Sequence, residues 1–182
     1  MHFVKTFPSL VFVVLSSLTI STLSLYAAEQ PTTPPPRIQK AVVTRVVDGD
    51  TFVVKLDRTT ETVRLIGIDT PELHHPTKKV ECFGKEASQN LSSLLLNKAI
   101  TLMDESLGTN RDKYGRLLRY AYLQDKPFAP VTFVNASMIS SGYAYAYTRF
   151  DFRFKEQFKQ YALNAKAHDR GLWAKNTCNG KR

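Results

Sequence analysis

The stretch from Val63 to Glu72 constrains the fold most strongly, because it begins as a strand and ends as a loop. Its first half is rich in branched apolar residues, which favour a mostly buried β-strand. Pro71 has no N–H group to donate and therefore ends the strand pairing. The charged side chains of Arg64, Asp69 and Glu72 are consequently expected to lie close together at this strand end.

A structural ion pair between Arg64 and one of the two acids explains this stretch equally well. Two other segments favour a functional site. A turn upstream carries Asp48 and Asp50, and residues 112–116 read Asp-Lys-Tyr-Gly-Arg. We interpret Asp48 as a turn residue that binds nearby backbone N–H groups, and Asp50 as a partner for Asp69.

The N-terminal region indicates export. Residues 1–28 combine an early lysine, a short apolar run and small residues, which are typical of a secretory signal peptide. We therefore expect the mature protein to be secreted or periplasmic. An uncleaved membrane anchor is the alternative. The proline-rich residues 29–37 are predicted to form an extended tether. We expect one folded domain over residues 38–178 and a tail at residues 179–182.

The formal net charge of the 182-residue chain is +9 at pH 7. A basic exported domain predicts a polyanionic partner, which could be nucleic acid, an anionic membrane surface or an acidic polysaccharide. The two cysteines, Cys82 and Cys178, form a plausible disulfide in an oxidising compartment. Two free thiols are the alternative.

Turn signals between apolar runs predict a meander of three strands, then two more strands and three helices. The strands are expected at 39–47, 52–56, 61–68, 99–103 and 116–123, and the helices at 84–97, 131–141 and 152–168. This order predicts an α+β fold built on a five-stranded Greek-key barrel of the OB type. A mixed open sheet is the alternative.

Asp50 and Asp69 are the candidate metal ligands. Two carboxylates that converge from adjacent strands repel each other unless a cation lies between them. Hard oxygen ligands suit Ca²⁺ or Mg²⁺, and the backbone carbonyl of Thr70 would complete the set. Arg64 and Arg116 could then clamp a phosphate group, because the planar guanidinium matches the phosphate oxygens.

Glu72 remains as a free carboxylate that could activate or orient a water molecule. Tyr114 could donate to a substrate or stack near it. Tyr143, Tyr145 and Tyr147 alternate along the chain, which would place three rings on one side of an extended segment, where bases could stack. A half-buried strand is the alternative interpretation of this pattern.

These motifs, in this order and spacing, resemble the micrococcal nuclease (thermonuclease) family over residues 40–173. The resemblance rests on Val-Asp-Gly-Asp-Thr at 47–51, on residues 64–72, and on the motifs at 86–88, 112–116 and 171–173. It implies an OB-fold endonuclease that cleaves phosphodiester bonds of DNA and RNA with Ca²⁺ and leaves 3′-phosphate ends. We expect such an enzyme to be a monomer.

The resemblance also implies a role for each matching residue. It implies calcium binding by Asp50, Asp69 and the carbonyl of Thr70, catalysis by Arg64, Glu72 and Arg116, and substrate binding by Lys113, Tyr114, Tyr145 and Tyr147. A shorter segment before Tyr145 departs from the family pattern. Two alternatives are a catalytically weak OB module that binds nucleic acid and a structural adaptor at the cell surface. The complete set of proposed catalytic and metal residues favours the enzyme.

Overall fold

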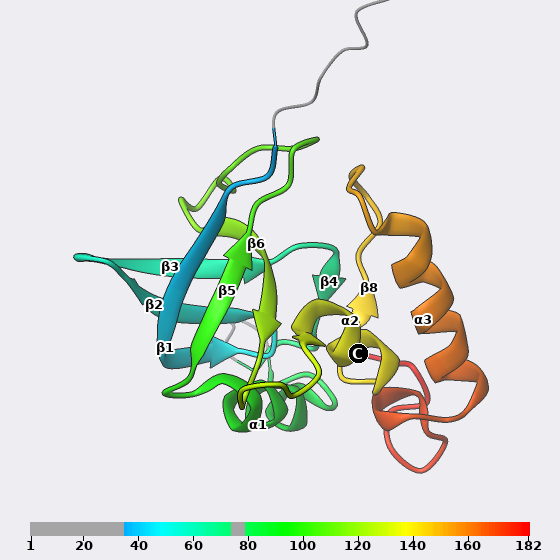
Figure 1. Ribbon diagram of the computed structural model, residues 1–182. Helices are drawn as coiled ribbons and strands as arrows, with labels where there is room; N and C mark the ends of the chain where they lie inside the picture. Colours follow the sequence, from blue (N-terminus) through cyan, green and yellow to red (C-terminus); the bar gives the residue numbers. More distant parts are fainter. Residues whose placement is uncertain (1–34, 74–78) are drawn as a thin grey trace, which may run out of the picture. The chain divides into compact units, whose positions relative to one another are not determined.

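Five of the strands close into a barrel in the computed structural model, which describes residues 35–73 and 79–182 (Figure 1). They are β1 (Ile38–Asp48), β2 (Thr51–Leu56), β3 (Thr59–Leu65), β5 (Ala99–Met103) and β6 (Leu117–Leu123). Their order is β3-β2-β1-β5-β6, and a parallel pairing of β3 with β6 closes the ring. Neighbours elsewhere in the ring are antiparallel. The predicted five-stranded barrel with three helices is confirmed.

The tight turn between β1 and β2 brings a helix against the end of the barrel. Asp48 pairs with Thr51 across this turn. A Cβ atom on Gly49 would lie 2.8 Å from both the Ala87 side chain and the Thr70 hydroxyl, so only glycine allows this close approach. The helix, α1 (Gly84–Leu95), therefore packs directly against the turn that carries the candidate metal ligand.

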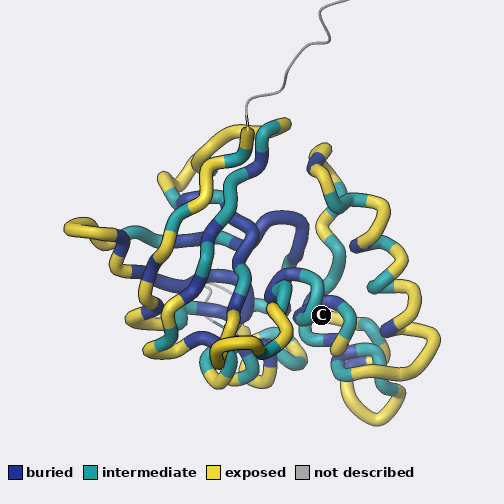
Figure 2. Tube along the Cα trace, viewed as in Figure 1, coloured by how far each residue is buried: buried dark blue, intermediate teal, exposed yellow. Residues whose placement is uncertain are grey.

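Three helices pack against the barrel and its neighbouring two-stranded sheet. The apolar stripe of α1 is buried, as its spacing predicts. Helices α2 (Val134–Ser140) and α3 (Lys155–Ala167) pack against each other, and the 3₁₀ helix η1 (Gly171–Trp173) follows α3. Figure 2 shows the buried core inside the barrel, whereas the tip of the β2–β3 hairpin and the outer side of α3 are exposed.

The two-residue strand β7 (Thr132–Phe133) pairs with β6, so α2 begins later than predicted.

The predicted strand at 61–68 is interrupted, and this corrects the expected path of the chain. β3 ends at Leu65, and the chain turns before β4 (Ile68–Asp69), which pairs with β8 (Tyr145–Ala146) outside the barrel. Gly67 lies in the left-handed region at φ +74°, and a Cβ atom there would lie 2.6 Å from the Phe152 ring. The turn therefore directs Asp69 away from the barrel ladder.

Cys82 and Cys178, for which the sequence leaves a disulfide and two free thiols open, form a disulfide with their Cα atoms 5.8 Å apart. It joins the segment before α1 to the segment after η1. The chain beyond Cys178 also contacts the domain, because the Gly180 N–H donates to the Leu172 carbonyl over 2.9 Å. Residues 179–182, expected as a tail, are thus held against the fold.

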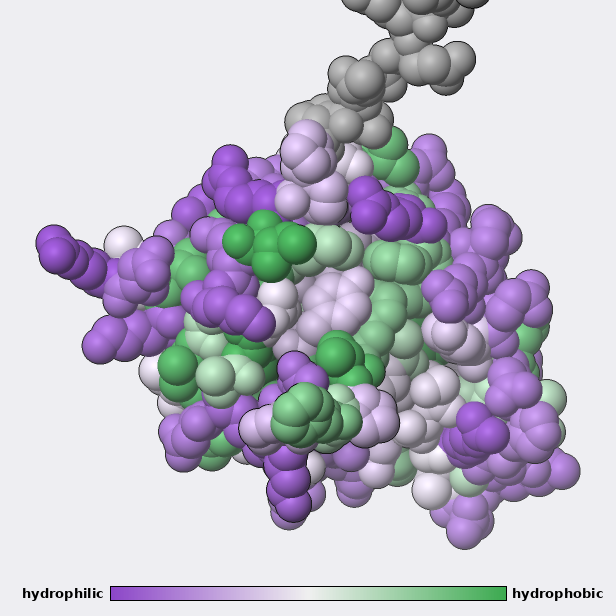
Figure 3. Space-filling view, in the orientation of Figure 1, coloured by the Kyte–Doolittle hydropathy of each residue, from purple (hydrophilic) through white to green (hydrophobic). Residues whose placement is uncertain are grey.

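Hydrophilic side chains surround the face seen in Figure 3, and hydrophobic side chains gather nearer its middle. Within residues 35–73 and 79–182, none of the helices has both the length and the apolar character needed to cross a membrane. The predicted signal peptide at 1–28 lies outside the described residues, as does most of the predicted tether.

Glu105 forms a buried polar cluster that joins two loops of the domain. Its carboxylate accepts hydrogen bonds from the Tyr120 hydroxyl, from the Arg153 N–H at 2.7 Å and from the Leu107 N–H at 3.0 Å. Burial alone would raise the pKa of Glu105, but these hydrogen bonds hold it below its ordinary value. The ionised carboxylate therefore stabilises the folded state.

We expect Glu105→Gln to lower the free energy of unfolding at pH 7 by about 1–3 kcal/mol, because it leaves buried donors without a full acceptor. The folded-state pKa is depressed, so this stabilisation is complete above the ordinary glutamate pKa of 4.5 and is lost as the pH falls through the folded-state value. Urea unfolding at pH 7 and at pH 3 measures both effects. Glu156→Gln, on the exposed side of α3, is the matched control; an equal loss in both variants would contradict the prediction.

Candidate active site

Arg64 is the centre of the site, and β3 and its partner strands fix its position. It lies opposite Thr51 on β2. Its guanidinium contacts two carboxylates, with Nη1 2.5 Å from Asp50 Oδ2 and Nη2 3.0 Å from Asp69 Oδ1. Nη1 also donates to the Ile68 carbonyl over 3.0 Å. The structural ion pair that the sequence allows therefore exists with Asp69, and Arg64 also pairs with Asp50, so it joins the two candidate metal ligands.

Asp50 is buried, and its carboxylate is surrounded by donors. Thr51 Oγ1 donates to Oδ1 over 2.8 Å, and the Thr70 N–H donates to Oδ2 over 3.1 Å. Burial raises the pKa of Asp50 above its ordinary value, although the positive charge of Arg64 acts in the opposite direction. A buried carboxylate of this kind gains stability from a cation nearby.

The donor set fits a hard divalent cation such as Ca²⁺. Asp50 and Asp69 offer carboxylate oxygens, and no thiol or imidazole competes with them in this set. In the part of the chain that the structure describes, no group of three or more His, Cys, Asp or Glu side chains is arranged to hold a metal ion. A cation at this position would therefore depend on these two carboxylates together with backbone oxygens such as that of Thr70.

Arg116 reaches the same cluster from the other side of the closing strand pair. Its Nε lies 2.6 Å from Asp112 Oδ2, and its Nη1 donates to Thr51 Oγ1 over 3.4 Å. The Thr51 hydroxyl in turn donates to Asp50, so a short chain of hydrogen bonds links the two. Sequence reasoning did not identify Thr51 or Asp112 as contributors. The spacing of four residues between Asp112 and Arg116 was the one available signal.

Glu72 lies within a region of concentrated negative charge. Burial is the main cause that raises its pKa to about 7, and the carboxylates of Asp48, Asp50 and Asp69 raise it further. The Glu72 N–H donates to Glu81 Oε2 over 3.1 Å, which fixes the backbone at this point. A carboxyl group with a pKa near neutrality can exchange a proton with water at ordinary pH.

Asp48 has the structural role that the sequence predicts. It accepts hydrogen bonds from the Gly49 N–H at 2.8 Å and from the Leu73 N–H at 3.3 Å. Asp48 therefore ties the β1–β2 turn to the segment that carries Glu72. Its influence on the pKa of Glu72 was not foreseen.

Lys113 and Tyr114 extend the site along the loop before β6. Tyr114 is 71% exposed. The Lys113 ammonium lies 4.9 Å from the centre of the Tyr114 ring, and the Arg116 guanidinium carbon lies 5.3 Å from it. The two cations beside this exposed ring are well placed to contact an anionic ligand.

Tyr145 lies beside the carboxylate cluster, because it pairs with Asp69 between β8 and β4. Its ring is nearly perpendicular to that of Trp173 at 5.3 Å. The other tyrosines of the alternating run have different neighbours: Tyr143 packs against Phe83 at 5.5 Å, and Tyr147 against Phe150 at 6.1 Å.

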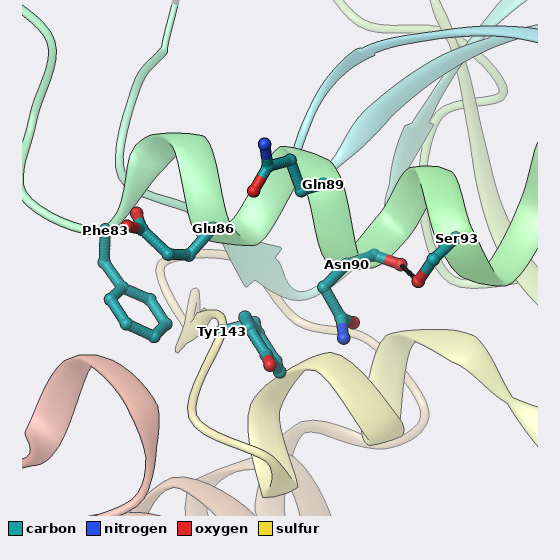
Figure 4. A pocket seen from close by; sticks show the side chains of 6 residues that line it. All are labelled: Phe83, Glu86, Gln89, Asn90, Ser93 and Tyr143. Carbon is teal, nitrogen blue, oxygen red and sulfur yellow. Dashed lines mark hydrogen bonds between the residues drawn. The ribbon is translucent and has the colours of Figure 1, made fainter.

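A separate open cavity of about 300 Å³ lies between α1 and Tyr143 (Figure 4). It is lined by aromatic and polar side chains, namely Phe83, Glu86, Gln89, Asn90, Ser93 and Tyr143. None of the predicted catalytic, metal or substrate-binding residues lines this cavity. The predicted site is instead the cluster around Arg64.

Fold and site together define an OB-type barrel with two guanidiniums and several carboxylates gathered beside the strand pair that closes the barrel. The chain belongs to the staphylococcal nuclease family: residues 62–175 match the family model described as "Staphylococcal nuclease homologue". The family predicted from the motifs is therefore confirmed.

Individual relatives agree with this assignment. The chain is 32% identical over 133 residues to the thermonuclease of Staphylococcus hyicus. This match covers 72% of this chain and 74% of that protein. It is 33% identical over 135 residues to the micrococcal nuclease of Shigella flexneri, covering 72% of each. It is 35% identical to the SPbeta prophage-derived endonuclease YokF of Bacillus subtilis, over 72% of this chain but only 43% of that protein.

Proposed function

We propose that this protein is an exported, calcium-dependent nuclease that hydrolyses phosphodiester bonds of DNA and RNA and leaves 3′-phosphate ends. The observation that carries the proposal is the contact of Arg64 with both Asp50 and Asp69. Membership of a family whose relatives include named nucleases and endonucleases supports it. The basic net charge suits a polyanionic substrate.

The side chains have distinct roles in this proposal. Arg64 and Arg116 bind the oxygens of the scissile phosphate, where negative charge increases in the transition state. Glu72 accepts a proton from the attacking water, whose oxygen bonds to phosphorus as the bond to the 5′-oxygen breaks. The departing 5′-oxygen takes a proton from solvent. When bound, Ca²⁺ supplies positive charge next to the phosphate oxygens, and Asp50, Asp69 and Thr70 would hold it.

Substrate binding is assigned to residues around this centre. Lys113 and Tyr114 contact a nucleotide phosphate, and Tyr145 and Tyr147 flank the nucleotide pocket. The position of Tyr145 next to Asp69 supports its part of this assignment. We propose that the folded protein acts as a monomer.

We also propose that the protein is secreted or periplasmic. The composition of residues 1–28 supports export. The Cys82–Cys178 disulfide supports the same conclusion, because disulfides persist in oxidising compartments.

The test is to incubate purified protein with single-stranded DNA and with RNA, in Ca²⁺ and in excess chelator, and to analyse the product ends. We expect cleavage in Ca²⁺, loss of cleavage in chelator, and 3′-phosphate ends. Mg²⁺ should support cleavage poorly, because it demands a tighter octahedral geometry than this oxygen set offers. Binding of both polymers without cleavage would favour the OB binding module. Full cleavage in chelator would refute the metal assignment.

A further inference from the structure

The segment 174–182 folds back onto the candidate site and is fixed there by several contacts. Cys178 is bonded to Cys82, and the Gly180 N–H donates to the Leu172 carbonyl over 2.9 Å. Gly180 has φ +72°, and a Cβ atom there would lie 2.8 Å from the Trp173 ring. The segment therefore reaches the site along a defined path.

This path places the guanidinium of Arg182 on Asp69. Arg182 Nη2 pairs with Asp69 Oδ2, and Arg182 Nη1 lies 3.8 Å from Glu81 Oε2. The guanidinium carbon also lies 4.7 Å from the centre of the Tyr145 ring. Arg182 thus contacts a proposed metal ligand and a proposed nucleotide-binding ring at the same time.

Both oxygens of Asp69 are consequently engaged by guanidiniums, because Arg64 binds Oδ1 at 3.0 Å. Each carboxylate oxygen has a second lone pair, but a cation bound to Asp69 would lie close to both guanidinium charges and would be repelled by them unless one contact opens. The Arg182 side chain is 41% exposed, whereas that of Arg64 is 16% exposed. Arg182 is therefore the partner that can leave at the lower cost.

We infer that Arg182 is an internal cation that competes with a divalent metal ion for Asp69, and that the disulfide-anchored segment thereby lowers the metal affinity of the site. This inference rests on the proposed role of Asp50 and Asp69 in binding Ca²⁺. The physical basis is that guanidinium and metal ion bind the same carboxylate oxygens and repel each other at close range. The apparent affinity then equals the intrinsic affinity multiplied by the fraction of molecules in which Arg182 has left.

The test is isothermal titration of the metal-free protein with CaCl₂. We expect Arg182→Ala to lower the apparent Kd by about two- to fivefold, which corresponds to the usual range for a partly exposed ion pair. The gain should shrink as the salt concentration increases, because salt screens the competing charge. Lys181→Ala is the matched control, since it removes an equal charge from the neighbouring residue and should change the Kd less.

A second measurement tests the role of the Cys82–Cys178 disulfide, which anchors the segment 174–182. In the Cys82→Ser/Cys178→Ser protein the segment loses its covalent anchor and is held less firmly, so Ca²⁺ should bind more tightly than to the parent, and Arg182→Ala should add less in that background. Thermal melts in chelator give a further readout that needs no metal: the effects of Arg182→Ala and Asp69→Ala should be non-additive if the two side chains are in contact in solution.

The outcomes separate this inference from the proposed function. If the parent binds Ca²⁺ and cleaves DNA, but Arg182→Ala leaves the Kd unchanged or raises it, the competition is refuted and the nuclease proposal stands. If Arg182→Ala and Lys181→Ala lower the Kd equally, general charge explains the effect and the inference is also refuted. If neither the parent nor Arg182→Ala binds Ca²⁺, the metal assignment and the competition both fail.

Discussion

Arg116→Lys is expected to reduce kcat for nucleic-acid cleavage by about 10²–10³-fold, as the loss of one preorganised donor to a transition-state oxyanion does. Lysine keeps the positive charge but lacks the planar fork that binds two oxygens at once. Arg116 is the more suitable of the two arginines for this test. Among residues 35–73 and 79–182 its ionic partner is Asp112 alone, whereas Arg64 pairs with the buried Asp50.

The control for this variant lies in the same loop. Arg111 pairs with both carboxylate oxygens of Glu61 at 2.9 Å, rather than with the Asp112 carboxylate that Arg116 binds. Arg111→Lys should therefore leave kcat within about twofold of the parent. Steady-state cleavage measures kcat, equilibrium binding in the absence of cleavage measures affinity, and a thermal melt confirms folding. Parent-like cleavage by Arg116→Lys would remove Arg116 from the proposed mechanism.

The second large effect is expected on stability. Replacing both cysteines, as Cys82→Ser/Cys178→Ser, should lower the free energy of unfolding by about 2–4 kcal/mol, because the bridge closes a loop with a sequence separation of 96. Urea unfolding of the parent under oxidising and reducing conditions, beside the double variant, measures this loss. Reduction should not change the stability of the double variant.

A thiol titration provides an independent check of the same bridge. The denatured parent should show no free thiol before reduction and two afterwards. Equal stability of the oxidised and reduced parent would contradict the predicted contribution of the disulfide.

Much of the fold could be predicted because its signals are local. The Asp-Gly turn between β-branched runs predicted the β1–β2 hairpin, and the apolar stripe along 84–97 predicted α1. The break after Leu65 was missed, because the branched apolar residues on both sides of Gly67 indicate one continuous strand. The reason for the break is tertiary: at Gly67 the Phe152 ring, from a distant segment, occupies the space of a side chain.

The candidate site, like the fold, has some contacts with a local sequence signal and others that depend on the complete tertiary structure. Arg64 and Asp69 are close in sequence, so their contact could be expected from one strand end. Asp50 was expected from its turn. The position of Arg182 could not be predicted, because it depends on the disulfide, on Gly180 packing against Trp173, and on the complete fold between them. Contacts of this kind have no local pattern in the sequence.

The parallel pairing that closes the barrel has a consequence for how the protein becomes active. Val63 pairs with Leu117 and Arg64 with Leu118, although these partners come from distant parts of the chain. Such long-range pairs bear the largest loop-closure cost and limit the rate of folding. Arg64 lies on β3, and Arg116 lies directly before β6. The two side chains therefore come together only in a chain whose barrel has closed. A chain that is still unfolded, including one in transit to another compartment, carries every residue of the site but has no assembled site.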